Sequence, residues 1–274
     1  LFAIAAGDSF SQLVFAGWRF ILAGLLVLLV AKGMGHRIVP VRSEWKPILW
    51  ISLFQSMLQY VCYYIGLSAT TGTKGSVLSG TQTFFALLFA HLFLANDKLN
   101  RRKTLGCLCG FAGVLVLGLG GLHGFQLRGD GLVLLSAASA GAGALVSRIF
   151  TPGRDPMLLT GWQLLLGGLL LGGIGAAGGG RLGAVSLPGA LLLAYMVVLS
   201  AAAFTIWTAL LGRFPVGKVT LFGFVIPVFG TLFSALVLGE QIFTLRNLAA
   251  LALVSGGIAV ANYVNEGKSS AKQA

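Results

Sequence analysis

Acidic residues are scarce in this chain. Only seven Asp and Glu occur among 274 residues, and charged residues of all kinds make up 9%. A soluble domain carries about 25% charged residues, so the composition argues against a soluble enzyme. All seven acids fall at the ends of apolar segments or between them, whereas proton relays of membrane proteins use acids inside the spanning segments. The sequence therefore shows neither such a relay nor the acid cluster of a metal-dependent lipid enzyme.

Cysteine is also rare. The three cysteines, Cys62, Cys107 and Cys109, all lie inside apolar segments. Cys107 and Cys109 are two residues apart and point to different faces of a helix, and no second His/Cys pair completes a zinc site. We expect buried, unreactive thiols, no metal and no other cofactor. Gly212–Lys218 resembles a phosphate loop, but Val219 stands where Ser or Thr should follow, so we interpret it as a connection between helices.

Apolar sequence is abundant instead. Hydrophobic residues make up 57% of the chain, and mean hydropathy is +0.91. A spanning helix needs about 20 apolar residues, and we expect Leu1–Ala6, which is too short, to end a first helix largely missing from this chain. Nine further segments approach the spanning length: Leu13–Met34, Trp45–Leu67, Gly75–Ala95, Thr104–Gly121, Asp130–Phe150, Met157–Gly173, Pro188–Leu211, Val219–Leu238 and Leu248–Val264. The sequence thus predicts an all-α integral membrane protein with ten transmembrane helices.

The placement of Lys and Arg predicts the orientation. If the connections alternate sides, 14 of the 19 basic residues lie on one side, and Lys74, Arg128, Arg181 and Arg246 lie on the other, with Arg19 inside a segment. An excess of basic residues marks the cytoplasmic side. We expect a multi-pass protein of a bacterial inner (plasma) membrane with a cytoplasmic C-terminus. The basic residues that give the net charge of +12 then set the topology and contact anionic lipid headgroups. The loops are too short for a nucleic-acid-binding module.

The chain repeats itself. Val14–Leu29 aligns with Leu158–Gly173 at an offset of 144, including the pair Gly17-Trp18 over Gly161-Trp162, and Gly80 matches Gly223 at an offset of 143. We predict two five-helix repeats, residues 1–127 (truncated at the N-terminus) and 128–274 (with a cytoplasmic tail). Because five is odd, the second copy enters the membrane from the opposite side. Such inverted repeats are typical of secondary transporters, whose substrate site lies between the copies near the midplane.

Several short motifs point to one family. Trp207, Pro227-Val228 and Leu238-Gly239-Glu240 lie in a stretch that resembles the EamA branch of the drug/metabolite transporter (DMT) superfamily, and Arg128-Gly129-Asp130-Gly131 is similar to the opening of its second repeat. Phe84 stands where the family has proline, so the sequence does not decide whether the fourth helix is kinked. The resemblance implies a secondary transporter, working without ATP by alternating access, that exports or exchanges small metabolites or drugs.

Two other functions stay open at this stage. A lipid or sugar-lipid carrier could use the same fold. A membrane-embedded lipid-modifying enzyme would need a catalytic cluster of acids, His or a nucleophile at one interface, and the sequence shows none, so we do not expect an enzyme.

Uncharged polar residues are the candidate substrate ligands. In the third helix Ser52, Gln55, Gln59 and Tyr63 follow each other at spacings of three, four and four, which places them on one face. Buried amides are costly without partners, so this face should meet protein or a wet cavity, as a substrate site or as contact between helices. Gln82 in the fourth helix and Trp207 in the eighth are further candidates for substrate binding.

Two features concern conformation and two concern packing. Pro227 in the ninth helix removes a backbone donor and frees the carbonyl of Gly223, so both are candidates for conformational change. Arg19 lies near the external end of the second helix, and we expect it to snorkel to the interface rather than bind an anion. Gly106-x-x-x-Gly110 fits close packing within the bundle or in a homodimer.

Overall fold

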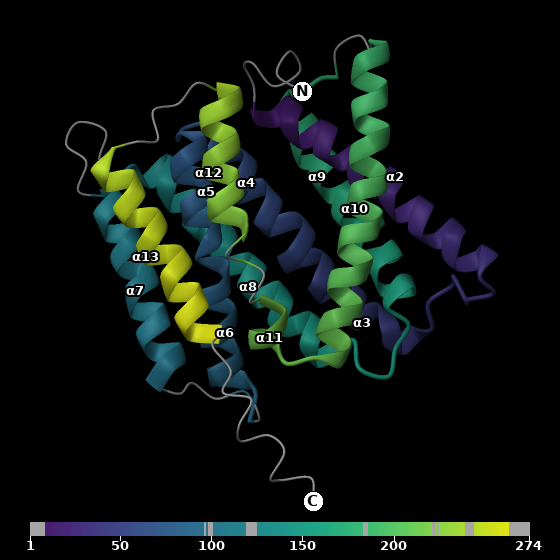
Figure 1. The fold of residues 1–274 in the computed structure, drawn as a ribbon. Coiled ribbons are helices and arrows are strands. Elements are labelled where there is room, and N and C mark those ends of the chain that lie inside the picture. The colour runs from purple at the N-terminus through teal and green to yellow at the C-terminus, as the bar shows by residue number, and fades with distance from the viewer. Residues whose placement is uncertain are drawn as a thin grey trace, which may run out of the picture.

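The computed structural model describes residues 9–95, 97, 101–118, 125–182, 186–220, 223, 225–238 and 244–262. All regular elements in these ranges are helices, two of them π-helical turns labelled η (Figure 1). In chain order they are α2 (Ser9–Gly33), α3 (Arg42–Ile51), η1 (Ser52–Leu58), α4 (Gln59–Leu67), α5 (Gly72–Gly80), α6 (Gln82–Phe93), α7 (Arg101–Gly118), η3 (Leu127–Gly131), α8 (Leu132–Phe150), α9 (Pro156–Ala177), α10 (Leu187–Arg213), α11 (Val216–Thr220), α12 (Val225–Leu238) and α13 (Leu245–Asn262).

The predicted apolar segments from Leu13–Met34 onward each coincide with one helix or with consecutive helices. Six stretches are long and apolar enough to cross a membrane: Ser9–Gly33, Arg42–Leu67, Gly72–Phe93, Leu127–Phe150, Pro156–Ala177 and Leu187–Arg213. Thr104–Gly113 and Leu245–Val260 are shorter apolar helices. The all-helical membrane fold is thereby confirmed, whereas the number of ten spans stays a prediction because Leu1–Ala6 lies outside the described residues.

Local sequence fixes where several helices begin. The side chain of Asp155 accepts a hydrogen bond from the Met157 N–H (2.8 Å) and caps α9, and Ser186 caps α10 in the same way through the Gly189 N–H (3.3 Å). Both caps are followed by proline in the first turn, where no backbone donor is needed. The outer faces carry exposed apolar side chains, such as Trp18 (49% exposed) and Phe233 (57%), as expected of surfaces that face lipid.

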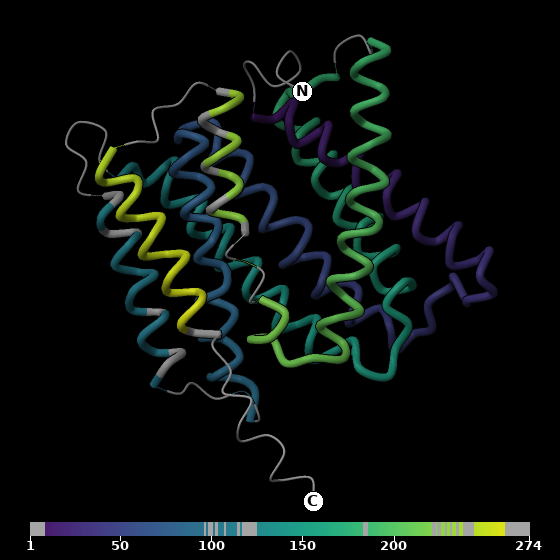
Figure 2. The backbone as a smooth tube through the Cα atoms, in the orientation of Figure 1, coloured from purple at the N-terminus to yellow at the C-terminus, as the bar shows by residue number. Residues whose placement is uncertain are grey.

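Helices from the two halves of the chain pair with each other. α2 packs along α9, α7 along α13, and α5 along α12 (Figures 1 and 2). Glycines make the first of these pairings close. A Cβ added at Gly17 would lie 2.8 Å from the Gly168 carbonyl oxygen, and one at Gly24 would lie 2.6 Å from the Gly161 carbonyl oxygen. The helix backbones therefore touch at two points, one on each side of the crossing.

The fourth and ninth predicted helices are both interrupted. α5 ends at Gly80 and α6 begins at Gln82, and the hydroxyl of Thr81 between them donates back to the Leu78 carbonyl (2.6 Å). The regular α-helix is thus interrupted at one residue without the proline that Phe84 replaces, and Thr81 stays in the right-handed helical region (φ −66°, ψ −12°), next to a glycine and with a back-bonding hydroxyl, both of which weaken a helix.

The break in the ninth helix precedes its proline. α11 ends at Thr220 and α12 begins at Val225, with Gly223 in a 3₁₀ conformation. Pro227 therefore lies in the first turn of α12 and not in mid-helix, as the sequence suggested. Proline is tolerated there because the first N–H groups of a helix have no intrahelical partner.

Candidate functional site

A cavity of about 310 Å³ lies between the two halves of the chain. Its walls come from η1, α4 and α6 in the first half and from α8, α10, α11 and α12 in the second. Both broken helices contribute, since Gln82 begins α6 and Thr220 ends α11. The lining residues are Gln55, Gln59, Tyr60, Gln82, Ala86, Ala140, Ala144, Ala203, Phe204, Trp207, Thr220 and Ile226. None of them carries a charge.

Three amides form the polar part of this wall. The Oε1 atom of Gln55 accepts a hydrogen bond from the buried hydroxyl of Ser147 in α8 (3.0 Å), and a Cβ at Gly143 would lie 2.9 Å from the Gln55 Cβ. Gln55 is therefore held by α8 as well as facing the cavity. Gln59 and Gln82 are half-buried and come from two different helices, so the cavity presents amide groups from more than one direction.

Tyr63 does not line the cavity, and Tyr60 takes the place predicted for it. Gln59 and Tyr63 both follow the π-helical stretch Ser52–Leu58 and lie in the regular helix α4, where Tyr63 is one turn, about 6 Å, farther along the axis and outside the cavity lining. The Tyr63 ring instead packs edge-on against Tyr64, with 5.9 Å between centroids. Within this π-helical turn, the Phe54 carbonyl accepts a hydrogen bond from the Ser139 hydroxyl (2.8 Å).

Aromatic side chains form one apolar wall. Trp207 and Phe204 come from α10, and Tyr60 comes from α4. Behind them, Phe20 of α2 packs edge-on against Tyr60 (4.7 Å between centroids) and Phe204 (5.5 Å). Sequence reasoning found Trp207 but missed Phe204, although Phe204 lies one helical turn before Trp207 and so on a nearby part of α10.

The two conformational candidates lie beside the cavity and not on its wall. Gly223 is next to Thr83 of α6, whose hydroxyl donates to the Thr220 carbonyl (3.3 Å). Pro227 is buried, and a Cβ added at Gly80 would lie 3.0 Å from its ring. Their neighbour Ile226 does line the cavity. Pro227 thus connects α12 to the fourth helix, and Gly223 connects the break before α12 to the same helix.

Arg19 is buried instead of snorkelling to an interface. Its side chain lies in the middle of α2, about 15 Å from Ser9, and only 7% of the residue is exposed. The guanidinium carbon lies 4.4 Å from the Phe20 ring centroid and 5.4 Å from that of Tyr60. The aromatic cluster covers the charge, so the expectation of a snorkelling side chain is wrong.

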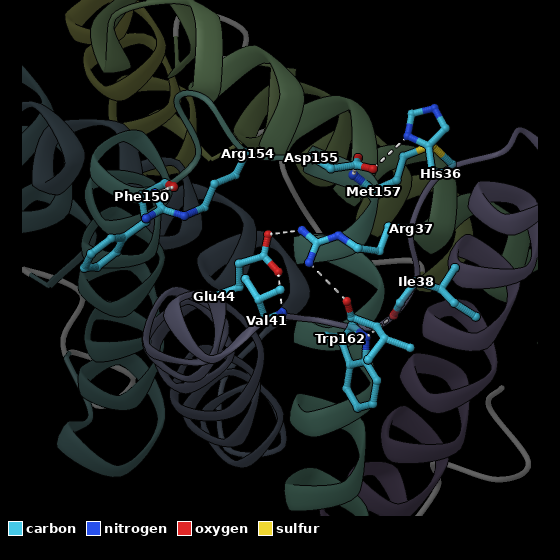
Figure 3. A network of polar contacts seen from close by, with 11 residues as sticks. His36, Arg37, Ile38, Val41, Glu44, Phe150, Arg154, Asp155, Met157 and Trp162 are labelled. Atoms are coloured by element: carbon cyan, nitrogen blue, oxygen red, sulfur yellow. Dashed lines mark hydrogen bonds and ion pairs between the residues drawn. The ribbon is translucent and has the colours of Figure 1, made fainter.

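Polar contacts join the halves at both ends of α3–α4. At one end, shown in Figure 3, His36 Nδ1 lies 2.7 Å from the Asp155 carboxylate, and the Trp162 indole N–H donates to the Ile38 carbonyl (2.8 Å). In the same network Glu44 accepts from Arg37 (2.7 Å) and from the Val41 N–H (2.8 Å).

At the other end the buried Asp130 takes the central place. Its carboxylate accepts from the Thr70 hydroxyl (2.5 Å) and from the Gln126 N–H (3.0 Å), and Lys74 Nζ lies 3.4 Å away. Contacts between the halves therefore lie at both ends of the α3–α4 segment.

Sequence comparison identifies the family. The model of the EamA-like transporter family matches residues 1–119 and 127–263. The chain belongs to this family, and the resemblance inferred from its motifs is confirmed. It is 27% identical over 253 residues to a WAT1-related chloroplastic protein of Arabidopsis thaliana, covering 88% of this chain and 60% of that protein.

Bacterial relatives are named as transporters. An uncharacterized transporter of Synechocystis is 30% identical over 266 residues, covering 86% of this chain and 78% of the relative, and the uncharacterized inner membrane transporter YedA of Escherichia coli K12 is 28% identical over 260 residues, covering 90% and 81%. A solved crystal structure at 20% identity superimposes with a TM-score of 0.70 over 95% of this chain and 92% of that one. This EamA-family chain is thus a multi-pass membrane protein of a transporter family.

Proposed function

We propose that this chain is a secondary transporter that moves small metabolites or drugs across a membrane without ATP, by alternating access, as an exporter or exchanger. The observation that carries the proposal is the cavity between the two halves, lined by residues at the breaks of both interrupted helices. Discontinuous helices around a site between repeats are typical of secondary transporters. Gln55, Gln59, Gln82 and Trp207 are the proposed substrate ligands. Tyr60 replaces Tyr63 in that set.

An inverted repeat of residues 1–127 and 128–274 is part of the proposal. At an offset of 144, Gly161 corresponds to Gly17 and Gly168 to Gly24. Gly17 contacts Gly168 and Gly24 contacts Gly161, which is the reciprocal pattern that a two-fold axis produces. The family model also matches in two ranges that divide near residue 120. An arrangement of ten helices completes this proposal.

The same axis relates the two breaks. Gly80 contacts Pro227, and Gly223, the counterpart of Gly80, contacts Thr83. We infer that Gly223 and Pro227 let α12 tilt against the fourth helix, while the contacts at Asp130 and Asp155 open in turn.

The size of the cavity favours a small molecule. Ligand pockets for small molecules measure about 300–1,000 Å³, and this one is at the lower limit. A lipid or sugar-lipid carrier would need room for an acyl chain, and copurified lipid in the cavity would favour it. Relatives named as transporters and the uncharged cavity wall support a transport role over an enzymatic one.

We propose a bacterial inner membrane location with the C-terminus in the cytoplasm, based on the charge distribution. The lipid bilayer and a small-molecule substrate are the expected partners. The Gly106-x-x-x-Gly110 motif does not argue for a homodimer, since a Cβ at Gly257 of α13 would lie 2.6 Å from the Gly106 carbonyl oxygen and 2.9 Å from the Gly110 nitrogen. The motif serves packing within the chain.

A ligand screen tests the function. Purified protein would be melted in the presence of amino acids, nucleosides, sugars, amines and common toxins, and each compound that raises the melting temperature would then be tested for transport in liposomes. Ala140→Phe, which fills the cavity from α8, is the control. Hits that lose both stabilisation and transport in this variant support the proposal, and transport that survives unchanged contradicts the location of the site.

A further inference from the structure

A positive charge that has no acidic partner among the described residues lies one aromatic ring away from the cavity. The Nε and Nη2 atoms of Arg19 are buried and have no hydrogen-bond partner. Its guanidinium packs on Tyr60, and Tyr60 also lines the cavity. The ring therefore separates the charge from the space where a substrate would bind.

No acid of the described part of the chain neutralises this charge. The ion pairs found there join His36 to Asp155, Arg37 to Glu44 and Lys74 to Asp130, all near the helix ends. A buried charge without an ionic partner is unfavourable in a protein or membrane interior. Contact with the Phe20 and Tyr60 rings and a side-chain hydrogen bond to Tyr60 offset only part of this cost. An anion in the cavity would supply the rest.

The residues of the cavity wall indicate the chemistry of the rest of such a ligand. Phe204, Trp207 and Ile226 offer apolar and aromatic surface, and Gln55, Gln59 and Gln82 offer amide groups that bond neutral or charged oxygens. No lining residue is acidic, so nothing on the wall repels a negative charge. A cationic ligand, in contrast, would face Arg19 with no acid to balance it.

We propose that the cavity selects a small organic carboxylate with an apolar or aromatic body, and that Arg19 attracts the carboxylate across or beside the Tyr60 ring. The inference rests on the proposed transport function and names its substrate class. Opposite charges separated by one aromatic ring in a protein interior attract each other more strongly than they do in water, because the effective dielectric constant there is about 20 and not about 80. A carboxylate should therefore bind at least about tenfold more tightly than its neutral isostere.

Three probes of nearly equal shape test this on the purified full chain. Phenylacetate is anionic, phenylacetamide neutral and phenethylamine cationic at pH 7. The dissociation constant of each follows from the melting temperature as a function of ligand concentration. We expect phenylacetate to bind best and phenethylamine worst. Equal binding of phenylacetate and phenylacetamide by the unaltered protein overturns the inference without any variant.

Two substitutions of Arg19 locate the source of the preference. Arg19→Lys keeps the charge and should keep a preference for phenylacetate. Arg19→Met removes the charge while retaining an apolar stem and should abolish the preference, with little change in phenylacetamide binding. If Arg19→Met melts at a lower temperature but still prefers phenylacetate, Arg19 serves packing alone and the inference is wrong. If no probe stabilises the unaltered protein, the proposed substrate class is wrong. The transport function is tested separately, by labelling a cysteine placed in the cavity at Ala140 with a thiol reagent from each side of the membrane, which needs no substrate.

Discussion

Gly17 of α2 contacts Gly168 of α9 so closely that a Cβ at Gly17 would lie 2.8 Å from the Gly168 carbonyl oxygen. Gly24 and Gly161 repeat this contact with the roles of the two halves exchanged. Only glycine allows two helix backbones to approach so closely. The crossing of α2 and α9 therefore depends on residue size at these positions and sets the distance between the two halves.

Gly17→Ala should destabilise the protein. The added methyl group would meet backbone atoms of Gly172 at 2.6–2.7 Å, and backbone cannot move aside as a side chain does. Overpacking of this kind costs about 1–3 kcal/mol, so the melting temperature should fall by about 2–10 °C. Gly173→Ala on α9 is the matched control, because nothing lies within 4 Å of its added Cβ. Equal melting temperatures for the two variants would contradict the close crossing.

Gln59→Leu should weaken substrate binding strongly and leave stability nearly unchanged. Gln59 lines the cavity, and removing one hydrogen-bond partner of a buried polar ligand group costs about 1–3 kcal/mol, or roughly five- to 150-fold in affinity. Tyr63→Phe should change neither quantity, because Tyr63 packs on Tyr64 away from the cavity. Affinity and melting temperature would be measured on the same preparation with any ligand from the screen. Loss of stability with unchanged affinity in Gln59→Leu would remove this residue from the site.

Pro227→Ala should fold normally and transport more slowly. Pro227 lies in the first turn of α12, where the N–H that alanine adds needs no intrahelical partner, so the helix should still form. Alanine removes the fixed φ angle that constrains the start of α12 after the break. Pro188→Ala provides the comparison, since Pro188 occupies the first turn of α10 but is exposed and lies far from the cavity lining. The measurement that distinguishes the two variants is the transport rate in liposomes at equal protein content. If both variants transport at the normal rate, Pro227 has only a packing role.

The orientation can be tested with single cysteines in a variant that lacks Cys62, Cys107 and Cys109. Val39→Cys reports on the connection between α2 and α3, where Val39 is 67% exposed, and Arg181→Cys reports on the connection after α9. An impermeant thiol reagent added to intact cells should label Arg181→Cys but label Val39→Cys only after permeabilisation. The opposite pattern would reverse the predicted orientation.

The length of the apolar segments was sufficient to predict the all-helical membrane fold. Such segments become helices because each must satisfy its backbone hydrogen bonds within itself in a membrane. Segment length does not reveal breaks that depend on few residues, such as the one at Thr81, where a single hydroxyl competes for the Leu78 carbonyl. The break before Val225 was attributed to Pro227 although it precedes that residue, since proline is compatible with a first helical turn.

The candidate site was predicted in part. Gln55, Gln59, Gln82 and Trp207 line the cavity because amides and a large aromatic side chain are poorly accommodated by lipid. Tyr63 was misplaced because helical spacing predicts the face of α4 on which a residue lies, but not where along the helix axis the cavity ends. The burial of Arg19 was missed for a different reason: Tyr60, which covers its guanidinium together with the neighbouring Phe20, comes from another helix, α4, and this contact depends on the tertiary fold.

Access to the cavity from both sides of the membrane is the most direct test of the account. Ala140 of α8 lines the cavity, and Ala140→Cys in the cysteine-free background places one thiol there without any assumption about the substrate. An impermeant thiol reagent would be added to vesicles of right-side-out and inside-out orientation. Alternating access predicts that the thiol is labelled in both preparations, and that Ala140→Cys combined with Pro227→Ala is labelled more slowly in at least one of them. Labelling of Ala140→Cys in only one orientation, at any reaction time, would contradict a transporter whose cavity opens to each side in turn.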